Sequence, residues 1–332
     1  MDLNRRQFAA GLASAGLGGS IALSGCATTG SKVADAPSRL VFLGQAKVFA
    51  LDPATGSVTT LVDQAPTDGS RPNGVNDGIA VHAATGQIFW TNMGRAAERD
   101  GYIMRCEADG SGVMTIVTPG GTFTPKQLKI DETAGKLYWA DREGMAIQRC
   151  NLDGSHIETL VTTGSAKFNV DDQTRWCVGM ALDPARGHVY WSQKGGDNAG
   201  QGVIRRADMV TPTGSTPTNR RDMVTLFSRL PEPIDLDLDL KTRTLYWSDR
   251  GDNTISRAPM DPGAGFSPAT RIDREVLVTG LKEAIGVALD LPRYRMAYTS
   301  LGGEVGIANL DGSQARIVHM AGGMLTGICW SA

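Results

Sequence analysis

The sequence has almost no net charge and few phenylalanines. Its 332 residues include 33 Lys or Arg and 35 Asp or Glu, which gives a formal charge of −2. A charge so close to zero produces no global field, so neither nucleic acid nor an anionic membrane surface is implied as a partner. Eight phenylalanines against 41 glycines indicate many tight turns and little helix. The 41% hydrophobic content still allows one large domain or two ordinary ones.

Several common catalytic signatures are also missing. The chain contains no Gly-x-Ser-x-Gly motif and no glycine-rich phosphate loop, and none of its five cysteines lies in a CxxC pair, which argues against a zinc site. Cys106 and Cys150 occupy the same place in consecutive repeats, where side chains lie too far apart to bridge. We expect Cys106, Cys150, Cys177 and Cys329 to be free, mostly buried thiols, although export would permit disulfides.

The N-terminus is predicted to lie outside the folded domain. The stretch NRRQFAAGLASAGLGGSIALSGC has paired Arg5 and Arg6 before a weakly apolar Gly/Ala-rich run and resembles a twin-arginine export signal. Leu23-Ser24-Gly25-Cys26 resembles a bacterial lipobox, which makes Cys26 the candidate lipidation site; a Sec-type signal or an accidental Arg pair are the alternatives. We therefore expect a signal peptide over 1–25 and a flexible polar tether over 26–37.

This resemblance also implies a location. Residue 27 is Ala rather than Asp, which by similarity to known lipoproteins favours the outer membrane over inner-membrane retention. The expected location is the bacterial cell envelope, with the domain facing the periplasm and the lipid anchor as its only membrane contact.

An aromatic motif recurs along the chain. GQIFWTN (86–92), GKLYWAD (135–141), GHVYWSQ (187–193) and RTLYWSD (243–249) align on four tryptophans, and RMAYTS (295–300) is a weaker copy with Tyr298 in the Trp place. Repeats about 50 residues long are typical of propellers or solenoids. Within each repeat the apolar residues alternate, which predicts strands, and turns such as Asp153-Gly154 predict hairpins. Four antiparallel strands per repeat form one propeller blade.

The aromatic pair has a structural explanation. Radially arranged sheets leave wedges that large apolar side chains fill, and one buried aromatic contributes on the order of 150–250 Å² of contact. The polar residue two positions after each Trp (Asn92, Asp141, Gln193, Asp249, with Ser300 in the weaker copy) is expected to accept backbone N–H bonds where the strand turns. The order Tyr-Trp-x-Asp, Ile-x-Arg, Leu-Asp-Gly-Ser resembles the YWTD repeats of low-density-lipoprotein-receptor-type six-bladed propellers.

The fold prediction is an all-β, six-bladed β-propeller of four-stranded antiparallel blades. Five blades are visible in the sequence: 77–117, 125–161, 178–227, 234–278 and 285–318. The sixth is expected to be composite, with three strands from 39–62 and an inner strand from 324–330. Joining the C-terminal strand to the N-terminal blade pairs both sheet edges, so one domain over 38–332 is predicted.

Long loops are expected on one face of the ring, where propellers place ligands at the mouth of the central channel. The segment RPNGVNDG (71–78) resembles the Asn-Asp entry into an inner strand of gluconolactonase-like propellers. That resemblance implies that Asn73, Asn76 and Asp77 bind ligand, with Asn76 and Asp77 as candidate ligands of Ca²⁺ or Mg²⁺; such runs also commonly form Asx turns. Gln127, Arg175, Trp176 and Glu283 are further candidates for binding a small polar ligand.

Two inner strands carry charge where the others carry small residues. QLKID places Gln127 and Lys129, and IDLDLD places Asp235 and Asp237, at positions that elsewhere read Gly-x-Ala. Carboxylates near a buried axis destabilise the fold unless they are paired. One interpretation is a structural bridge to Lys129; the other is a catalytic acid/base or metal site formed by Asp235, Asp237 and Lys129, in which repulsion raises one pKa.

Two classes of function follow. YWTD-like propellers usually bind a protein or glycan, which favours a binding module for an unknown protein, glycan or small polar ligand at the channel face. Resemblance to gluconolactonases implies instead a hydrolase, or a lyase or isomerase, at the channel mouth. The insertions 207–223 and 259–275 on the opposite face are a candidate partner surface. No cofactor is required, although Ca²⁺ or Mg²⁺ remains open.

Overall fold

Alternation of apolar and polar residues produces strands throughout most of the chain. The computed structural model describes residues 38–65, 74–95 and 98–331; Cys26, Asn73 and the expected signal peptide and tether lie outside these ranges. The strands form six four-stranded antiparallel sheets, and the described residues after 37 belong to one compact unit. No helix in the described part is long and apolar enough to cross a membrane.

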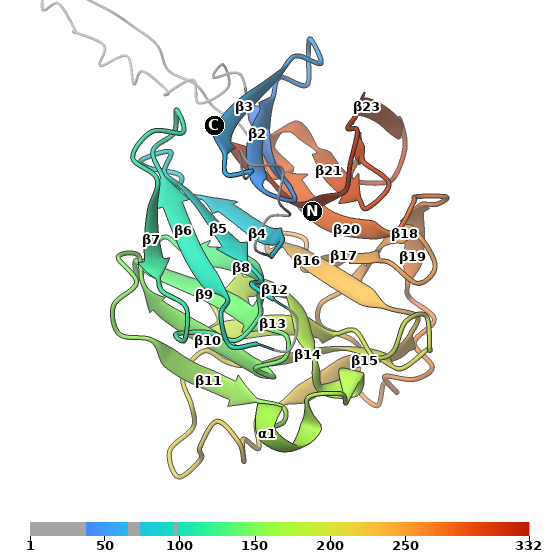
Figure 1. Cartoon of the computed structure of the whole chain (residues 1–332). Helices are drawn as coiled ribbons and strands as arrows, with labels where there is room; N and C mark the ends of the chain where they lie inside the picture. Colours follow the sequence, from blue (N-terminus) through green and yellow to red (C-terminus); the bar gives the residue numbers. More distant parts are fainter. Residues whose placement is uncertain (1–37, 66–73, 96–97, 332) are drawn as a thin grey trace, which may run out of the picture. The chain divides into compact units, whose positions relative to one another are not determined.

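Each sheet is one blade of a propeller (Figure 1). From the channel outward, blade 1 contains β24 (Leu325–Ser331), β1 (Arg39–Gly44), β2 (Lys47–Leu51) and β3 (Val58–Asp63). Blade 2 contains β4 (Asn76–Val81), β5 (Ile88–Asn92), β6 (Tyr102–Cys106) and β7 (Met114–Val117). Blade 3 contains β8 (Pro125–Asp131), β9 (Lys136–Asp141), β10 (Ala146–Asn151) and β11 (Glu158–Thr162).

Blades 4 to 6 follow the same order. Blade 4 contains β12 (Cys177–Asp183), β13 (His188–Gln193), β14 (Gly202–Asp208) and β15 (Val224–Leu230). Blade 5 contains β16 (Pro233–Asp239), β17 (Thr244–Asp249), β18 (Thr254–Pro259) and β19 (Glu275–Val278). Blade 6 contains β20 (Ala284–Asp290), β21 (Arg295–Ser300), β22 (Glu304–Asn309) and β23 (Arg316–Met320). The short helical turns are α1 (Ala166–Asn169), η1 (Gln173–Arg175) and η2 (Leu291–Arg293).

The composite blade closes the ring as predicted. β24 pairs antiparallel with β1, with Leu40 opposite Trp330 and Phe42 opposite Ile328. Its other neighbours are the inner strands β4 and β20 of the flanking blades. The C-terminal strand thus supplies the inner edge of a blade whose three other strands come from the start of the domain.

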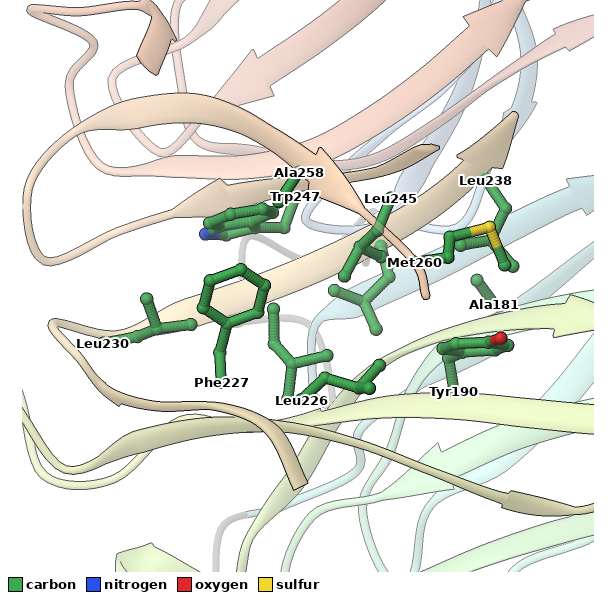
Figure 2. Close-up of a cluster of buried hydrophobic side chains, with 12 residues drawn as sticks. Ala181, Tyr190, Leu226, Phe227, Leu230, Leu238, Leu245, Trp247, Ala258 and Met260 are labelled. Carbon is green, nitrogen blue, oxygen red and sulfur yellow. The ribbon is translucent and has the colours of Figure 1, made fainter. Parts of the chain in front are cut away.

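The wedges between blades are filled by the recurring aromatic pair. In each Tyr-Trp motif the two side chains point to opposite sheet faces because the side-chain direction alternates along a strand. Tyr190 of blade 4 and Trp247 of blade 5 therefore enter the same cluster, with Phe227 packed against the indole at a ring-centroid distance of 5.1 Å (Figure 2). All four motif tryptophans have 0% exposure.

The polar residue two positions after the aromatic accepts backbone N–H bonds in four of the five copies. Asp141 accepts from Phe123 and Thr124 at 2.7 Å each, and Asp249 accepts from Glu232 at 2.9 Å. Asn92 and Ser300 each accept one such bond. The expectation is wrong for Gln193, because its Oε1 accepts from the Trp191 indole and its Nε2 donates to the Thr174 carbonyl.

The two insertions form hydrogen bonds with the outer strand of the preceding blade. In the first, Pro217 accepts from the Thr162 N–H at the edge of blade 3, and the Arg220 guanidinium donates to the Leu160 carbonyl at 3.0 Å. In the second, Pro268 accepts from the Ser228 N–H at the edge of blade 4, and Arg271 donates to the Leu226 carbonyl. Each insertion therefore stabilises the edge of the preceding blade, whereas the sequence had suggested a partner surface.

Candidate functional site

The loop-rich end of the channel opens into a cavity of about 260 Å³, which we call the channel mouth. Three sets of equivalent positions line it. One set, such as Asp77 and Lys126, lies within the first residues of the inner strands. Another, such as Glu232, lies immediately before an inner strand. The remaining set, such as Arg142, lies three residues after the motif aromatic. The lining residues are Val75, Asp77, Met93, Lys126, Arg142, Val178, Lys194, Glu232, Ile234, Arg250, Ile285, Leu301, Met324 and Thr326.

At the positions three residues after the motif aromatic, charged and apolar side chains lie on different blades. The position three residues after the aromatic is Arg142 in blade 3, Lys194 in blade 4 and Arg250 in blade 5, but Met93 in blade 2 and Leu301 in blade 6. Ile285 and Met324 are further apolar lining residues. Four lining cations, Lys126, Arg142, Lys194 and Arg250, stand against two lining carboxylates, Asp77 and Glu232. Three further carboxylates pair with these cations from just outside the lining: Glu143, Asp197 and Glu283.

A chain of ion pairs fixes the cationic side. Glu232, of which 2% is exposed, accepts from Lys194 at 3.0 Å and from Arg250 at 3.1 Å. Lys194 also contacts Asp197 at 2.7 Å, and Arg250 contacts Glu283 at 2.9 Å. The hydrogen bond from Lys194 holds the pKa of Asp197 below its usual value. These contacts order long side chains before any ligand arrives, which reduces the entropic cost of binding.

Trp176 connects two of these cations. The Arg142 guanidinium carbon lies 4.9 Å from the centre of the indole ring, and Lys194 Nζ lies 5.7 Å from it, both within cation–π range. Arg142 Nε and Nη2 bond the buried carboxylate of Glu143. Burial raises the pKa of Glu143, but the adjacent Arg142 outweighs burial and lowers that pKa overall. Arg142 Nη1 makes no hydrogen bond within the described part of the chain and remains free for a ligand.

Asp77 and Lys126 form an ion pair between the inner strands of blades 2 and 3. The Asp77 side chain is almost fully buried, and Gln127 Nε2 donates to its other oxygen at 3.2 Å. Burial depresses the pKa of Lys126, and the Asp77 carboxylate opposes that change. A cation already neutralises the carboxylate that the proposed metal site requires.

The described residues therefore do not fit a divalent metal ion at Asn76 and Asp77. Asn76 is fully buried, and its Oδ1 accepts from Asn92 Nδ2 at 3.0 Å. No group of three or more His, Cys, Asp or Glu in the described ranges is arranged to hold a metal. Ca²⁺ and Mg²⁺ require several oxygen ligands, and here an ammonium group contacts Asp77 instead.

The remaining candidates from the sequence divide between two places. Trp176 and Glu283 lie at the channel mouth through their contacts with Arg142 and Arg250. Arg175 turns away from it, because its guanidinium bonds Asp172 and the Thr163 carbonyl at 2.7 Å each. Lys129 and Asp237 line a separate cavity, formed with the later residues of the inner strands.

The acids of β16 bond backbone groups of the next blade. Asp235 accepts from the Val287 N–H at 3.1 Å and Asp237 from the Leu289 N–H at 2.9 Å. No N–O contact within 4.0 Å joins Lys129 to either carboxylate, so the bridge to Lys129, one of the two interpretations of these acids, is not made by a direct contact. Burial raises the pKa of Asp235 to about 7, against the lowering effect of Lys129.

Arg142, Lys194, Glu232 and Arg250 were not anticipated as site residues. Their signal was present in the repeat itself, because three of them stand three residues after the motif Trp. Glu232 precedes its inner strand at the position of Trp176 and Glu283 in their blades. The four described cysteines are free thiols, and Cys106, Cys150 and Cys177 are buried.

The fold and this site define a six-bladed propeller of YWTD type with a polar, ion-paired channel mouth. The chain belongs to the SMP-30/gluconolactonase/LRE-like family, whose model matches residues 2–198. It is 40% identical over 262 residues to a low-density lipoprotein receptor-related protein 1 of Pyricularia oryzae, covering 76% of this chain and 84% of that protein.

Two further comparisons give one relative in sequence and one in structure. A 3-hydroxyacyl-CoA dehydrogenase-like protein LAM1 of Cochliobolus heterostrophus is 39% identical over 263 residues, which cover 76% of this chain and 55% of that protein. This chain therefore spans about half of that relative's length. The crystal structure of a nidogen/laminin complex contains a chain that matches with a TM-score of 0.66 at 20% identity, covering 89% of this chain and 98% of that one.

Proposed function

We propose that the protein is a binding module that holds a small polar ligand with a carboxylate group at its channel mouth. The observation that carries this proposal is the free Nη1 group of Arg142 in a row of ordered cations on blades 3 to 5, with the apolar residues Met93, Leu301 and Met324 on the neighbouring blades. A carboxylate would contact the free Arg142 Nη1 and would replace the exposed Asp197 carboxylate on the Lys194 ammonium. The rest of the ligand would lie against the apolar residues and the Trp176 ring.

The test is calorimetric titration of the full chain with D-gluconate, a sugar acid chosen because of the family match. Lys194→Met is the informative variant, because Glu232 keeps its contact with Arg250 at 3.1 Å when Lys194 is replaced. We expect affinity to fall roughly tenfold or more, as charged hydrogen bonds are worth about 1.5–3 kcal/mol. Lys241→Met, an exposed lysine in the turn after β16, is the matched control. Equal gluconate affinity in the two variants, or no binding at all, would contradict the proposal.

A hydrolase is the second candidate, supported by the family match and by the buried Asp77–Lys126 pair at the channel mouth. In that case Asp77 and Lys126 would act as an acid/base pair on a lactone, because both side chains line the cavity. Titration of released acid during incubation with D-glucono-1,5-lactone distinguishes the candidates. Hydrolysis above the uncatalysed rate that is lost in Asp77→Asn favours the enzyme; gluconate binding without hydrolysis favours the binding module.

We also propose that the chain is exported by the twin-arginine route and lipid-anchored through Cys26 to the outer membrane, facing the periplasm. The support is the sequence of residues 4–26. Replacing Arg5 and Arg6 together by Lys should leave the protein in the cytoplasm on cell fractionation, whereas Cys26→Ser should export it without membrane attachment. Normal export of the Lys-Lys variant would rule out this route.

A further inference from the structure

A second cavity of about 280 Å³ lies along the later residues of the inner strands. We call it the far cavity. All six inner strands contribute to it, so it lies on the channel axis. It is lined by Ile79, Ala80, Val81, Lys129, Ile130, Glu132, Leu182, Asp237, Ala288, Leu289, Ile328, Cys329 and Trp330. None of these residues lines the channel mouth, so the two sites can be tested separately.

Two opposite charges stand at one level of this cavity. Each inner strand of blades 2 to 6 has one residue opposite the position that precedes the motif aromatic. In blade order these residues are Ala80, Lys129, Ala181, Asp237 and Ala288. Blade 4 separates the lysine from the aspartate and contributes only the methyl group of Ala181. Small residues at the other positions leave the two charged groups facing an open space.

The carboxylate is fixed and the ammonium is not. Asp237 Oδ1 accepts from the Leu238 N–H and Oδ2 from the Leu289 N–H, both at 2.9 Å. Lys129 makes no hydrogen bond or ion pair with any residue in the described ranges. Burial lowers the pKa of Lys129, but the nearby charges of Asp237 and Asp235 outweigh burial and raise it. The ammonium is thus charged, close to the carboxylates and without direct contact to them.

Three other titratable groups lie in or near the far cavity. Asp235, with its pKa raised to about 7 by burial, carries only part of a charge near neutral pH. Glu132 is paired with His82 at 3.1 Å and accepts from the Ala83 N–H. Burial also raises the pKa of the Cys329 thiol to about 12, so it stays neutral. A ligand with a single charge could pair with only one of Lys129 and Asp237, whereas a dipolar ligand could pair with both.

We propose that the far cavity binds a small zwitterion of the α-amino acid type, with its carboxylate on Lys129 and its ammonium on Asp237. The ligand carboxylate would accept a hydrogen bond from Lys129, which has no partner in the described ranges. The ligand ammonium would donate a further hydrogen bond to Asp237, which already accepts two from the backbone. Its aliphatic side chain packs against Leu182, Leu289 and Ile328, which form apolar walls of the cavity. A volume of about 280 Å³ accommodates a single amino acid.

Calorimetric titration of the full chain with L-leucine and L-alanine tests this proposal. Two probes remove one charge each from the leucine skeleton: 4-methylpentanoate lacks the amine, and 3-methylbutylammonium lacks the carboxylate. We expect at least one amino acid to bind, and each single-charge probe to bind roughly tenfold more weakly or worse, because each loses one charged hydrogen bond. Binding of 4-methylpentanoate as tight as that of leucine would overturn the zwitterion proposal.

Variants separate this site from the channel mouth. Lys129→Met breaks no hydrogen bond of the described structure, so it should remain folded, and we expect it to lose amino-acid binding at least about tenfold. Lys194→Met at the channel mouth and the exposed Lys241→Met should leave amino-acid binding unchanged. No binding of either amino acid, or equal binding by Lys129→Met, overturns the proposal whatever the outcome with gluconate.

Discussion

Replacing Trp247 by Ala should remove a large part of the stability of the whole domain. The indole is fully buried between blades 4 and 5, where it contacts Phe227 in a cluster to which both blades contribute (Figure 2). Burial of about 150–250 Å² at about 25 cal/mol per Å² corresponds to roughly 4–6 kcal/mol. This is an upper estimate because the unfolded chain already buries part of that surface. Measured Trp→Ala changes in cores are about 3–5 kcal/mol, a large fraction of a typical stability of about 5–15 kcal/mol.

The structure also predicts a difference between two tryptophans. Trp139 Nε1 donates to Thr122 Oγ1 at 3.0 Å, whereas Trp247 Nε1 has no partner among the described residues. Trp139→Phe should therefore lower the free energy of unfolding by about 1 kcal/mol more than Trp247→Phe does, because a typical hydrogen bond contributes about that much. The assay is urea-induced unfolding, with Tyr294→Ala, half-exposed on the surface, as a control expected within about 0.5 kcal/mol of the parent.

The outcome that would refute this reasoning is specific. A loss below about 1 kcal/mol for Trp247→Ala would mean that the wedges between blades do not depend on the aromatic side chains. A double-mutant cycle with Phe227→Ala adds a second check, because directly packed aromatic rings should couple by about 0.5–1.5 kcal/mol.

Three further predictions concern closure, crowding and pH. Removing residues 323–332 takes away the strand that pairs with β1 and lies beside β4 and β20, and it should abolish cooperative thermal unfolding. A folded, monomeric truncation would contradict ring closure. Gly179→Ala should be strongly destabilising in urea, since a Cβ there would lie 1.8 Å from the Ile234 carbonyl oxygen, whereas Gly263→Ala, with nothing within 4 Å, should be neutral. Because burial raises the folded-state pKa of Asp235 to about 7, its contribution to stability is full below about pH 4 and is lost as pH rises through 7. Asp235→Asn should reduce the dependence of the free energy of unfolding on pH between about pH 4 and 7. An unchanged pH dependence would contradict a raised pKa at Asp235.

Most of the architecture could be predicted from the repeat. Blade boundaries predicted at 77–117 and 234–278 agree with strands that run from Asn76 to Val117 and from Pro233 to Val278. The glycines of the inner strands were also expected, and Gly179 shows why only glycine fits. These predictions rest on local rules: strand alternation, the positive φ of turn glycines, and the pairing of sheet edges.

The insertions and the acids of β16 were harder to predict. Arg220 and Arg271 stand in polar segments that look like solvated loops, yet their guanidinium groups bond carbonyl oxygens of a neighbouring blade. Asp235 and Asp237 were recognised as unusual, and one of the two interpretations paired them with Lys129. In the structure they accept hydrogen bonds from backbone N–H groups of β20. The partner of a long side chain depends on three-dimensional reach, and residue spacing carries no information about it.

The sequence alone dictated a closed ring of six aromatic-filled blades, because each blade repeats one locally encoded pattern and the two chain ends complete one sheet. Only the folded arrangement decided which charges meet around the axis. Asp77 contacts Lys126, Glu232 contacts two cations, and Lys129 contacts none within the described structure. The reason is geometric: inner strands from residues about 50 or more apart converge on one channel, and the angle between blades determines which side chains approach each other.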